Sequence, residues 1–476
     1  MLTNLTNQIS RAVAQRVELK VPQQTTAFLG RLRYQRWNES LSQARVLHVN
    51  ERVGYRLMSV LYHPVTGWPH FVYERYNRTQ ITHLRLHEHW NDSRAQYVQA
   101  AAVRRQIRDW TCVEPDGSFY IASHDSELKK LIVLVEHPIR PNRYYFYSPN
   151  EPAGRRMRFL FSTQPSLDNV TGLSPKRSIE VPTRAGDNMH CFLTMPFGAP
   201  QQCDGGLVSD PQPMVLYVHG GPHRIHDVYY FDFRVQQLAN RGMAVLQCNF
   251  HGSSGYGDAW VRAGYDEWGG RMQRDLYDAV DYAVSTGIAD PNRLAIAGGS
   301  YGGYATMLAL ANNTRNFQCG VSAAGMSNLT HFFVNSVTRS RDLCRWCLVR
   351  RFGVDASTAN GSEWLLTRSP VVQAQRIRQP LLLIHGRQDR AVRPEHSDWM
   401  AAELRNASTP FDYMIFEEAG HFSSPHSTKY RLLKAMEEEF LARCLNLTYE
   451  PVSAKEFCSE KIVVNATNLM ELPKCD

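Results

Sequence analysis

The chain lacks any long apolar run. No stretch of its 476 residues approaches the roughly 18 consecutive apolar residues of a membrane-spanning helix, so we expect none. Its 53 Lys and Arg residues are scattered, and the net charge of +8 is modest for this length. Nucleic-acid sites concentrate positive charge on one face, so we expect no nucleic-acid partner. The composition, 43% hydrophobic and 21% charged, is typical of a globular protein.

The first 20 residues also lack the charged leader and apolar core of a signal peptide. The sequence nevertheless contains eleven Asn-x-Ser/Thr sequons, whereas chance would give about three. We therefore predict a glycoprotein of the secretory pathway or the extracellular space. The alternative is a cytoplasmic protein with Asn-rich loops. The two observations agree if Met1 is not the natural start and a further segment precedes it.

Metal-binding patterns are absent from the ten cysteines. Cys344 and Cys347 form a C-x-x-C, but no second Cys or His pair follows at zinc spacing. No strand precedes this motif, as one would in a thioredoxin-like unit. Cys458 and Cys475 flank the C-terminal segment and would be able to pair in an oxidising compartment, although spacing alone leaves the connectivity open.

Within residues 1–175, short strands separated by turns fill the part from about residue 45 to residue 175. Examples are LMSVLYHPVTGWPHFVYERY and DGSFYIASHDSELKKLIVLVEH, with no helical pattern between strands. This pattern predicts an all-β region, with a sandwich or a propeller as the natural architectures. At roughly 40–45 residues per blade, the region would hold at most about four blades.

The pattern changes in residues 176–450. Apolar strands such as MVLYVHG, MAVLQCNF and LLLIHG alternate with helical stretches such as RMQRDLYDAVDYAVSTG. Continuous apolar strands between helices indicate a parallel sheet that is covered on both faces. We therefore predict an α/β fold with a mostly parallel, doubly wound sheet, and we separate residues 451–476 as a C-terminal tail.

Gly298-x-Ser300-x-Gly302 lies between the strand RLAIA and the helix YATMLALAN. This is the setting of a nucleophile elbow, a turn so tight that only glycines avoid collision around the serine. The backbone N–H of Tyr301 would then stabilise an oxyanion at the helix N-terminus. An ordinary glycine-rich turn is the alternative.

A nucleophilic serine needs a base and an orienting acid, which follow it in the order acid, then histidine, in this class. Asp389 follows the strand LLLIHG, and His421 follows the strand DYMIFEE. Both would lie at the sheet edge where Ser300 lies, so we predict Asp389 as the acid and His421 as the base. The alternative is a turn-capping aspartate and a surface histidine.

The segment HGGPH, residues 219–223, follows an earlier strand and would supply the second oxyanion donor. We favour the backbone N–H of Gly221, because glycine lets the backbone approach a substrate carbonyl. His219, His223 and His226 also cluster here. No acidic or cysteine ligand joins them at useful spacing, so we predict no metal site.

Seven stretches together resemble the prolyl oligopeptidase family of serine peptidases: HGGPH, NFHGSSGYG (249–257), WGGRMQRDLYDAVDYA (268–283), GGSYGGYA (298–305), SPVVQAQRI (369–377), HGRQDRAV (385–392) and EEAGH (417–421). The resemblance covers about residues 175–445 and is closest to the acylaminoacyl and dipeptidyl peptidases. It implies an α/β-hydrolase domain, the triad Ser300, Asp389 and His421, and Tyr301 and Gly221 as oxyanion donors. It also implies a short peptide substrate and no cofactor.

Two residues depart from the family pattern, and the propeller is shorter than expected. His251 stands where relatives have arginine, which would weaken an ion pair or a substrate contact. His219 stands where some relatives have a tyrosine whose hydroxyl is an oxyanion donor. Relatives also carry a complete propeller, whereas residues 1–175 here are too few for one.

Substrate-binding residues are less well defined. Phe332 and Phe333 are candidates for the pocket, with core packing as the alternative. Glu127 and Glu136 are isolated candidates for holding a free amino terminus, although such residues are more often solvated. An esterase on the same triad and a catalytically inactive binding homologue are the alternative functions. A homo-oligomer remains open.

Overall fold

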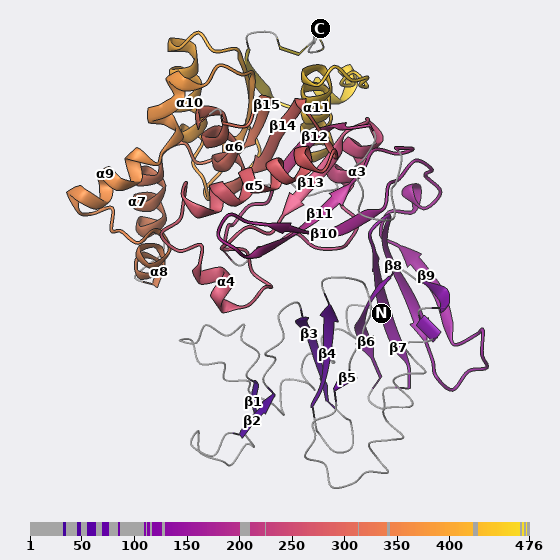
Figure 1. Cartoon of the computed structure of the whole chain (residues 1–476). Coiled ribbons are helices and arrows are strands. Elements are labelled where there is room, and N and C mark those ends of the chain that lie inside the picture. Colours follow the sequence, from indigo (N-terminus) through magenta and orange to yellow (C-terminus); the bar gives the residue numbers. More distant parts are fainter. Residues whose placement is uncertain are drawn as a thin grey trace.

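The structure, a computed structural model, describes five short strands before residue 86 and then residues 109–473. Gaps in the second range fall at residues 111, 115–116, 126–128, 200–209, 224, 313, 340–342, 422–426, 467–468 and 471–472. An α/β part and a set of antiparallel sheets are visible as separate regions in Figure 1.

A nine-stranded sheet forms the centre of the α/β part. Its order is β10-β11-β13-β12-β14-β15-β16-β17-β18. The six strands from β13 to β17 run parallel, and β10, β11 and β18 add antiparallel edges. The bounds are β10 Lys176–Pro182, β11 Asn188–Thr194, β12 Gln212–Val218, β13 Ala244–Cys248, β14 Ala289–Gly299, β15 Phe317–Ala323, β16 Leu381–Gly386, β17 Phe411–Phe416 and β18 Ile462–Ala466.

Helices cover both faces of this sheet (Figure 1). Along β12, Met214 and Leu216 join one buried cluster, while Val215 and Tyr217 join the other. Successive side chains of a strand point to opposite faces, so two separate cores confirm the predicted doubly wound arrangement. The helices are α3 Phe233–Asn240, α4 Asp258–Arg262, α5 Arg271–Ser285, α6 Tyr301–Asn312, α7 Leu329–Arg339, α8 Leu343–Phe352, α9 Ala359–Thr367, α10 Glu395–Asn406, α11 Thr428–Cys444 and α12 Ala454–Phe457.

Helix α5 shows why these segments are helical. Leu276, Ala279, Val280 and Ala283 recur at spacings of three and four residues, and all are buried in one core. Within the described part of the chain, no helix is long and apolar enough to cross a membrane.

The N-terminal region contains only antiparallel sheets. One sheet has four strands in the order β6-β7-β8-β9, with bounds Ser118–His124, Leu131–His137, Arg140–Tyr147 and Met157–Ser162. The others are β3-β4-β5, at Tyr55–Tyr62, Pro69–Arg75 and Leu84–Arg85, and β1-β2, at Leu32–Tyr34 and Arg45–His48. These sheets are consistent with the predicted partial propeller.

The C-terminal segment belongs to the α/β part. The sequence separates residues 451–476 as a tail, yet β18 pairs with β17 as the last strand of the sheet. Val452, Phe457 and Met470 are buried in the same core as α11. A short edge strand that follows a one-turn helix gives too little periodicity to be recognised in the sequence.

Disulfides tie elements that lie far apart in the sequence. Cys191 of β11 bonds Cys248 of β13, and Cys319 of β15 bonds Cys444 at the end of α11. Cys458 is also disulfide-bonded, and Cys475 lies outside the described residues.

Candidate active site

Ser300 is the single residue between β14 and α6. Its φ of 57° is a left-handed conformation that non-glycine residues seldom adopt. Its backbone N–H donates to the carbonyl of Ala323 at 2.8 Å, which holds the turn against β15. Strained residues of this kind cluster at functional sites.

The flanking glycines are required by space. A Cβ on Gly298 would lie 2.5 Å from the carbonyl oxygen of Val218, and a Cβ on Gly302 would lie 2.1 Å from it. Val218 is the last residue of the neighbouring strand β12, where it is the register partner of Gly298. The turn therefore has the geometry that the sequence predicts for a nucleophile elbow.

Asp389 and His421 meet at the same edge of the sheet. The His421 Nδ1 atom lies 2.6 Å from Asp389 Oδ2. Asp389 is 4% exposed, and its Oδ1 accepts the backbone N–H groups of Ala391 and Val392 at 2.8 and 3.0 Å. A carboxylate that accepts from Nδ1–H fixes the imidazole tautomer, so that Nε2 is the atom that takes a proton.

The charge of Asp389 is stabilised by its neighbours. Burial alone would raise the pKa of this carboxyl, but hydrogen bonds from His385 and His421 lower the pKa well below its ordinary value. The residue therefore stays ionised at neutral pH, as an orienting acid must.

Close packing of two loops brings this pair together. A Cβ on Gly386, at the end of β16, would lie 2.4 Å from the carbonyl oxygens of both Ala419 and Gly420. The Gln388 N–H also donates to the Ala419 carbonyl at 2.9 Å. Glycine at the end of β16 thus lets the loop before His421 lie directly against the loop that carries Asp389.

A second histidine contacts the acid, and the sequence analysis did not identify it. His385 is buried; its Nε2 lies 3.4 Å from Asp389 Oδ2 and 3.0 Å from the Val392 carbonyl. Its Nδ1 pairs with Ser397 Oγ at 2.7 Å. Its place four residues before Asp389, at the end of an apolar strand, was the available signal.

The Gly220–Gly221 backbone lies beside the serine. A Cβ on Gly220 would lie 3.2 Å from the Gly299 carbonyl oxygen and 3.5 Å from Ser300 Cβ. Tyr301 is the first residue of α6, so its N–H is among those left without an acceptor inside the helix. Both predicted oxyanion donors therefore belong to backbone adjoining Ser300, and their roles stay predictions.

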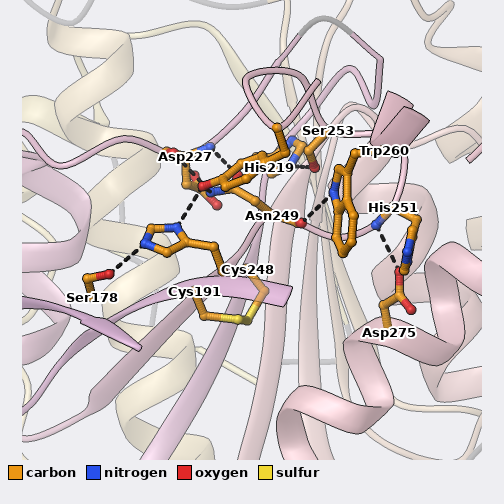
Figure 2. The surroundings of a disulfide bond; sticks show 12 residues. Ser178, Cys191, His219, Asp227, Cys248, Asn249, His251, Ser253, Trp260 and Asp275 are labelled. Atoms are coloured by element: carbon orange, nitrogen blue, oxygen red, sulfur yellow. Dashed lines mark hydrogen bonds and ion pairs between the residues drawn. A yellow bond between two sulfur atoms is a disulfide. The ribbon is translucent and has the colours of Figure 1, made fainter. Parts of the chain in front are cut away.

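The imidazole of His219 is fully engaged. Its Nδ1 lies 2.7 Å from the Gly220 carbonyl and its Nε2 lies 2.8 Å from Ser253 Oγ (Figure 2). Burial lowers the pKa of His219 to about 4, outweighing the bond to the Gly220 carbonyl. The ring is thus neutral at pH 7, with no nitrogen left for direct contact with an oxyanion. Among the described residues, no group of three or more His, Cys, Asp or Glu side chains is arranged to hold a metal.

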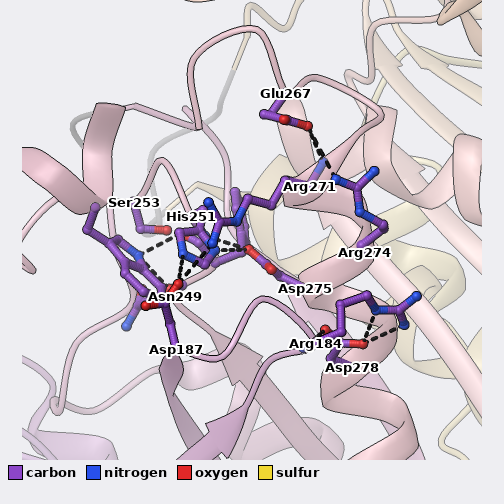
Figure 3. Close-up of polar contacts among 12 residues, drawn as sticks. Arg184, Asp187, Asn249, His251, Ser253, Glu267, Arg271, Arg274, Asp275 and Asp278 are labelled. Carbon is purple, nitrogen blue, oxygen red and sulfur yellow. Dashed lines mark hydrogen bonds and ion pairs between the residues drawn. The ribbon is translucent and has the colours of Figure 1, made fainter. Parts of the chain in front are cut away.

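His251, where the resemblance leads us to expect arginine in relatives, contacts acidic side chains. Its Nδ1 lies 2.6 Å from Asp275 Oδ2 of α5, and its Nε2 lies 3.3 Å from Asp187 (Figure 3). Its ring stacks on the ring of Trp260, with the two ring centroids 3.8 Å apart. The predicted weakening of a structural link is therefore offset by an imidazole that bridges two carboxylates.

The two phenylalanines predicted for the substrate pocket differ in burial. Phe333 is 2% exposed and packs against Phe352 in the core, which is the core-packing alternative. Phe332 is half-buried, with its ring 6.4 Å from Trp268, and stays a pocket prediction. Glu136 lies on β7, and Glu127 lies outside the described residues.

The parallel sheet, the strained serine between strand and helix, and the aspartate–histidine pair define an α/β-hydrolase. Residues 229–448 match the prolyl oligopeptidase family, so the chain carries a domain of that family. This confirms the resemblance inferred from the seven sequence stretches.

Relatives and solved structures agree with this assignment. The chain is 35% identical over 381 residues to dipeptidyl aminopeptidase BIII of Pseudoxanthomonas mexicana, covering 77% of this chain and 54% of the relative. It is 30% identical over 441 residues to dipeptidyl peptidase family member 6 of Caenorhabditis elegans, covering 89% and 56%. A puromycin-hydrolyzing peptidase of Mycobacterium tuberculosis superimposes with a TM-score of 0.58 at 28% identity, covering 68% of this chain and 47% of that structure. The chain therefore spans about half the length of the proteins that it matches.

Proposed function

We propose that the protein is a serine peptidase that cleaves short peptides near their amino terminus. The observation that carries the proposal is the 2.6 Å bond between Asp389 and His421, at the sheet edge where Ser300 occupies a strained elbow. The names of the relatives, a dipeptidyl aminopeptidase and a dipeptidyl peptidase, support the choice of substrate class, with acylaminoacyl peptides as a second substrate type.

In the proposed reaction, Ser300 Oγ attacks the peptide carbonyl while His421 Nε2 takes its proton. Asp389 stabilises the imidazolium that forms. The N–H groups of Tyr301 and Gly221 donate hydrogen bonds to the developing oxyanion. His421 then passes the proton to the departing amine. In the second half of the reaction, His421 takes a proton from water as the water attacks the acyl group, and it returns the proton to Ser300 Oγ as the acyl group leaves.

Covalent labelling tests the nucleophile. We expect a fluorophosphonate probe to label the purified chain and Ser300→Ala to abolish labelling. Ser285→Ala, which changes an exposed serine at the end of α5, is the matched control and should label like the wild type. Labelling that survives Ser300→Ala would reject the assignment.

Substrate panels test the reaction class. Dipeptidyl and N-acylaminoacyl nitroanilides should be turned over, with every activity lost in Ser300→Ala. An esterase on the same triad would hydrolyse short nitrophenyl esters and leave the amides intact. An inactive binding homologue would hydrolyse neither group and resist the probe. Light scattering of the same sample determines whether the chain forms the homo-oligomer that the sequence leaves open.

The protein is further proposed to enter the secretory pathway and carry N-glycans. Among the sequon asparagines whose burial the structure describes, five are exposed: Asn169, Asn312, Asn360, Asn406 and Asn446. The disulfides are of a kind that persists in oxidising compartments. Asn328 should stay unmodified, because it is half-buried and its Oδ1 accepts the His331 N–H at 2.9 Å. Glycopeptide mapping after expression behind a secretion signal tests this pattern, and a chain without any N-glycan would contradict it.

A further inference from the structure

His219 is held at both ends beside the serine elbow. The residue is 8% exposed, and its ring stacks on Phe250 with the ring centroids 4.5 Å apart. One nitrogen contacts the Gly220 carbonyl and the other contacts Ser253 Oγ, as Figure 2 shows for the serine. Ser253 lies in the loop that follows β13. The imidazole therefore links that loop to the glycine pair that adjoins Ser300.

These contacts fix the tautomer. A carbonyl oxygen only accepts hydrogen bonds, so the Nδ1 atom that faces the Gly220 carbonyl carries the proton. Nε2 is then an acceptor, and the Ser253 hydroxyl donates to it. The low pKa that burial gives His219 keeps this neutral tautomer in place at neutral pH.

The Gly220 carbonyl and the Gly221 N–H belong to one peptide unit. That unit is planar, so an interaction that fixes the direction of the oxygen also fixes the direction of the N–H on its other side. Hydrogen bonding at the oxygen also polarises the N–H, because such bonds strengthen one another in a chain. Among the described residues, no protein acceptor binds the Gly221 N–H.

We propose that His219 is a positioning residue that aligns and polarises the Gly221 N–H through the shared peptide unit, and that Ser253 aligns His219. This proposal rests on the proposed peptidase function. In this chain the side chain acts one step back, through the backbone. A ring that served only as packing against Phe250 would need neither of its polar contacts.

The matched variants are a pair of adjacent serines. Ser253→Ala removes the donor to His219. Ser254→Ala changes the next residue of that loop and removes a hydroxyl whose oxygen lies 2.9 Å from His226 Nδ1; among the described residues, Ser254 has no hydrogen bond to His219. His219→Phe keeps the stacking and removes both hydrogen bonds, and His219→Asn retains a side-chain amide donor near the position of Nδ1.

The readout separates ground-state from transition-state binding. Loss of one direct oxyanion donor costs about 10²–10³ in kcat, so we expect His219→Phe, which misaligns a donor, to lose about 10- to 100-fold in kcat. KM should stay within about twofold of wild type, because the oxyanion exists only after attack. The inhibition constant of a peptide aldehyde, which forms an anionic adduct with the serine, should rise by the same factor as kcat falls. His219→Asn should recover part of the loss, and Ser253→Ala should lose less than His219→Phe.

The proposal is overturned if Ser253→Ala and Ser254→Ala have the same kcat, or if His219 variants raise KM at constant kcat. Ser253→Ala also keeps the test valid should His219→Phe fail to fold. This inference alone is rejected if the fluorophosphonate probe labels Ser300 of the wild-type chain and His219→Phe has the same kcat as the wild type. A wild-type chain that neither labels nor hydrolyses peptides rejects the proposed function as well.

Discussion

A single methyl group at Gly302 should damage the nucleophile elbow. The Cβ of Gly302→Ala would lie 2.1 Å from the Val218 carbonyl oxygen and 3.0 Å from its carbon. Ordinary contact needs 3.4–4 Å, so strand and helix would have to separate by more than about 1 Å, the size of a misplacement that costs about 10²-fold in rate. Because β12 continues directly into His219, the shift would move the oxyanion side as well as Ser300.

We therefore expect Gly302→Ala to lower kcat/KM by at least about 10²-fold. Overpacking of a close-packed interior should also cost about 1–3 kcal/mol of stability. The assay combines nitroanilide hydrolysis, the rate of fluorophosphonate labelling and the urea midpoint. The labelling rate should fall together with kcat/KM, because both depend on the position of Ser300.

Gly186→Ala is the matched control. Gly186 has φ 89° in the turn between β10 and β11, and a Cβ there would meet nothing within 4 Å. This variant carries a left-handed alanine, which costs about 1–2 kcal/mol without a clash. Its urea midpoint should fall while its kcat/KM stays unchanged. A Gly302→Ala enzyme with kcat/KM within twofold of wild type would refute the steric reasoning, and equal losses in both variants would mean that activity follows stability alone.

Three other predictions test the charges and cross-links of the fold. Asp389→Asn should lower kcat by about 10⁴ with an intact fold, because the imidazole of His421 loses its orienting acceptor; circular dichroism checks the fold. The Cys319–Cys444 disulfide has a sequence separation of 125 residues, and Cys191–Cys248 has one of 57. Removing the first should lower the free energy of unfolding by about 5 kcal/mol and removing the second by about 4 kcal/mol, because the longer loop gains more entropy in the unfolded chain. A reversed order of the urea midpoints would contradict this loop-length argument. Acidification should also destabilise the fold, because burial lowers the pKa of His190 and His219 to about 4 and of His223 and His396 to about 3. The unfolded chain takes up these protons near pH 6.5, so stability should fall between about pH 6.5 and 4 by up to about 1.4 kcal/mol per pH unit for each histidine, and a urea midpoint that is flat over this range would contradict it.

The turn at Ser300 and the contact between Asp389 and His421 were predictable because their signals are local and ordered along the chain. Ser300 sits among glycines between an apolar strand and a helix, and Asp389 and His421 each follow an apolar strand. Parallel strands place their carboxyl ends at one edge of a sheet, so this pattern alone brings the loops to one edge. The structure places Asp389 and His421 in contact as that reasoning expects.

Contacts between distant segments were not predictable in the same way. The bond between His219 and Ser253 joins loops that follow β12 and β13, and nothing near either residue specifies the other. The contact between His385 and Asp389 is local in the sequence, but it depends on how the turn after β16 closes. The edge strand β18 is defined by its antiparallel pairing with β17, whose other side pairs with β16. Each of these features is fixed by tertiary packing, which hydrophobic periodicity does not encode.

The proposed chemistry is confined to one part of the chain. Its groups come from the ends of β12, β14, β16 and β17 and the loops that follow them, and none belongs to residues 1–175. The attack, the proton transfer and the oxyanion contacts of the proposed reaction therefore depend on the nine-stranded sheet and its loops. Substitutions in the antiparallel sheets should accordingly alter KM and substrate choice, and substitutions beside β12 and β14 should alter kcat.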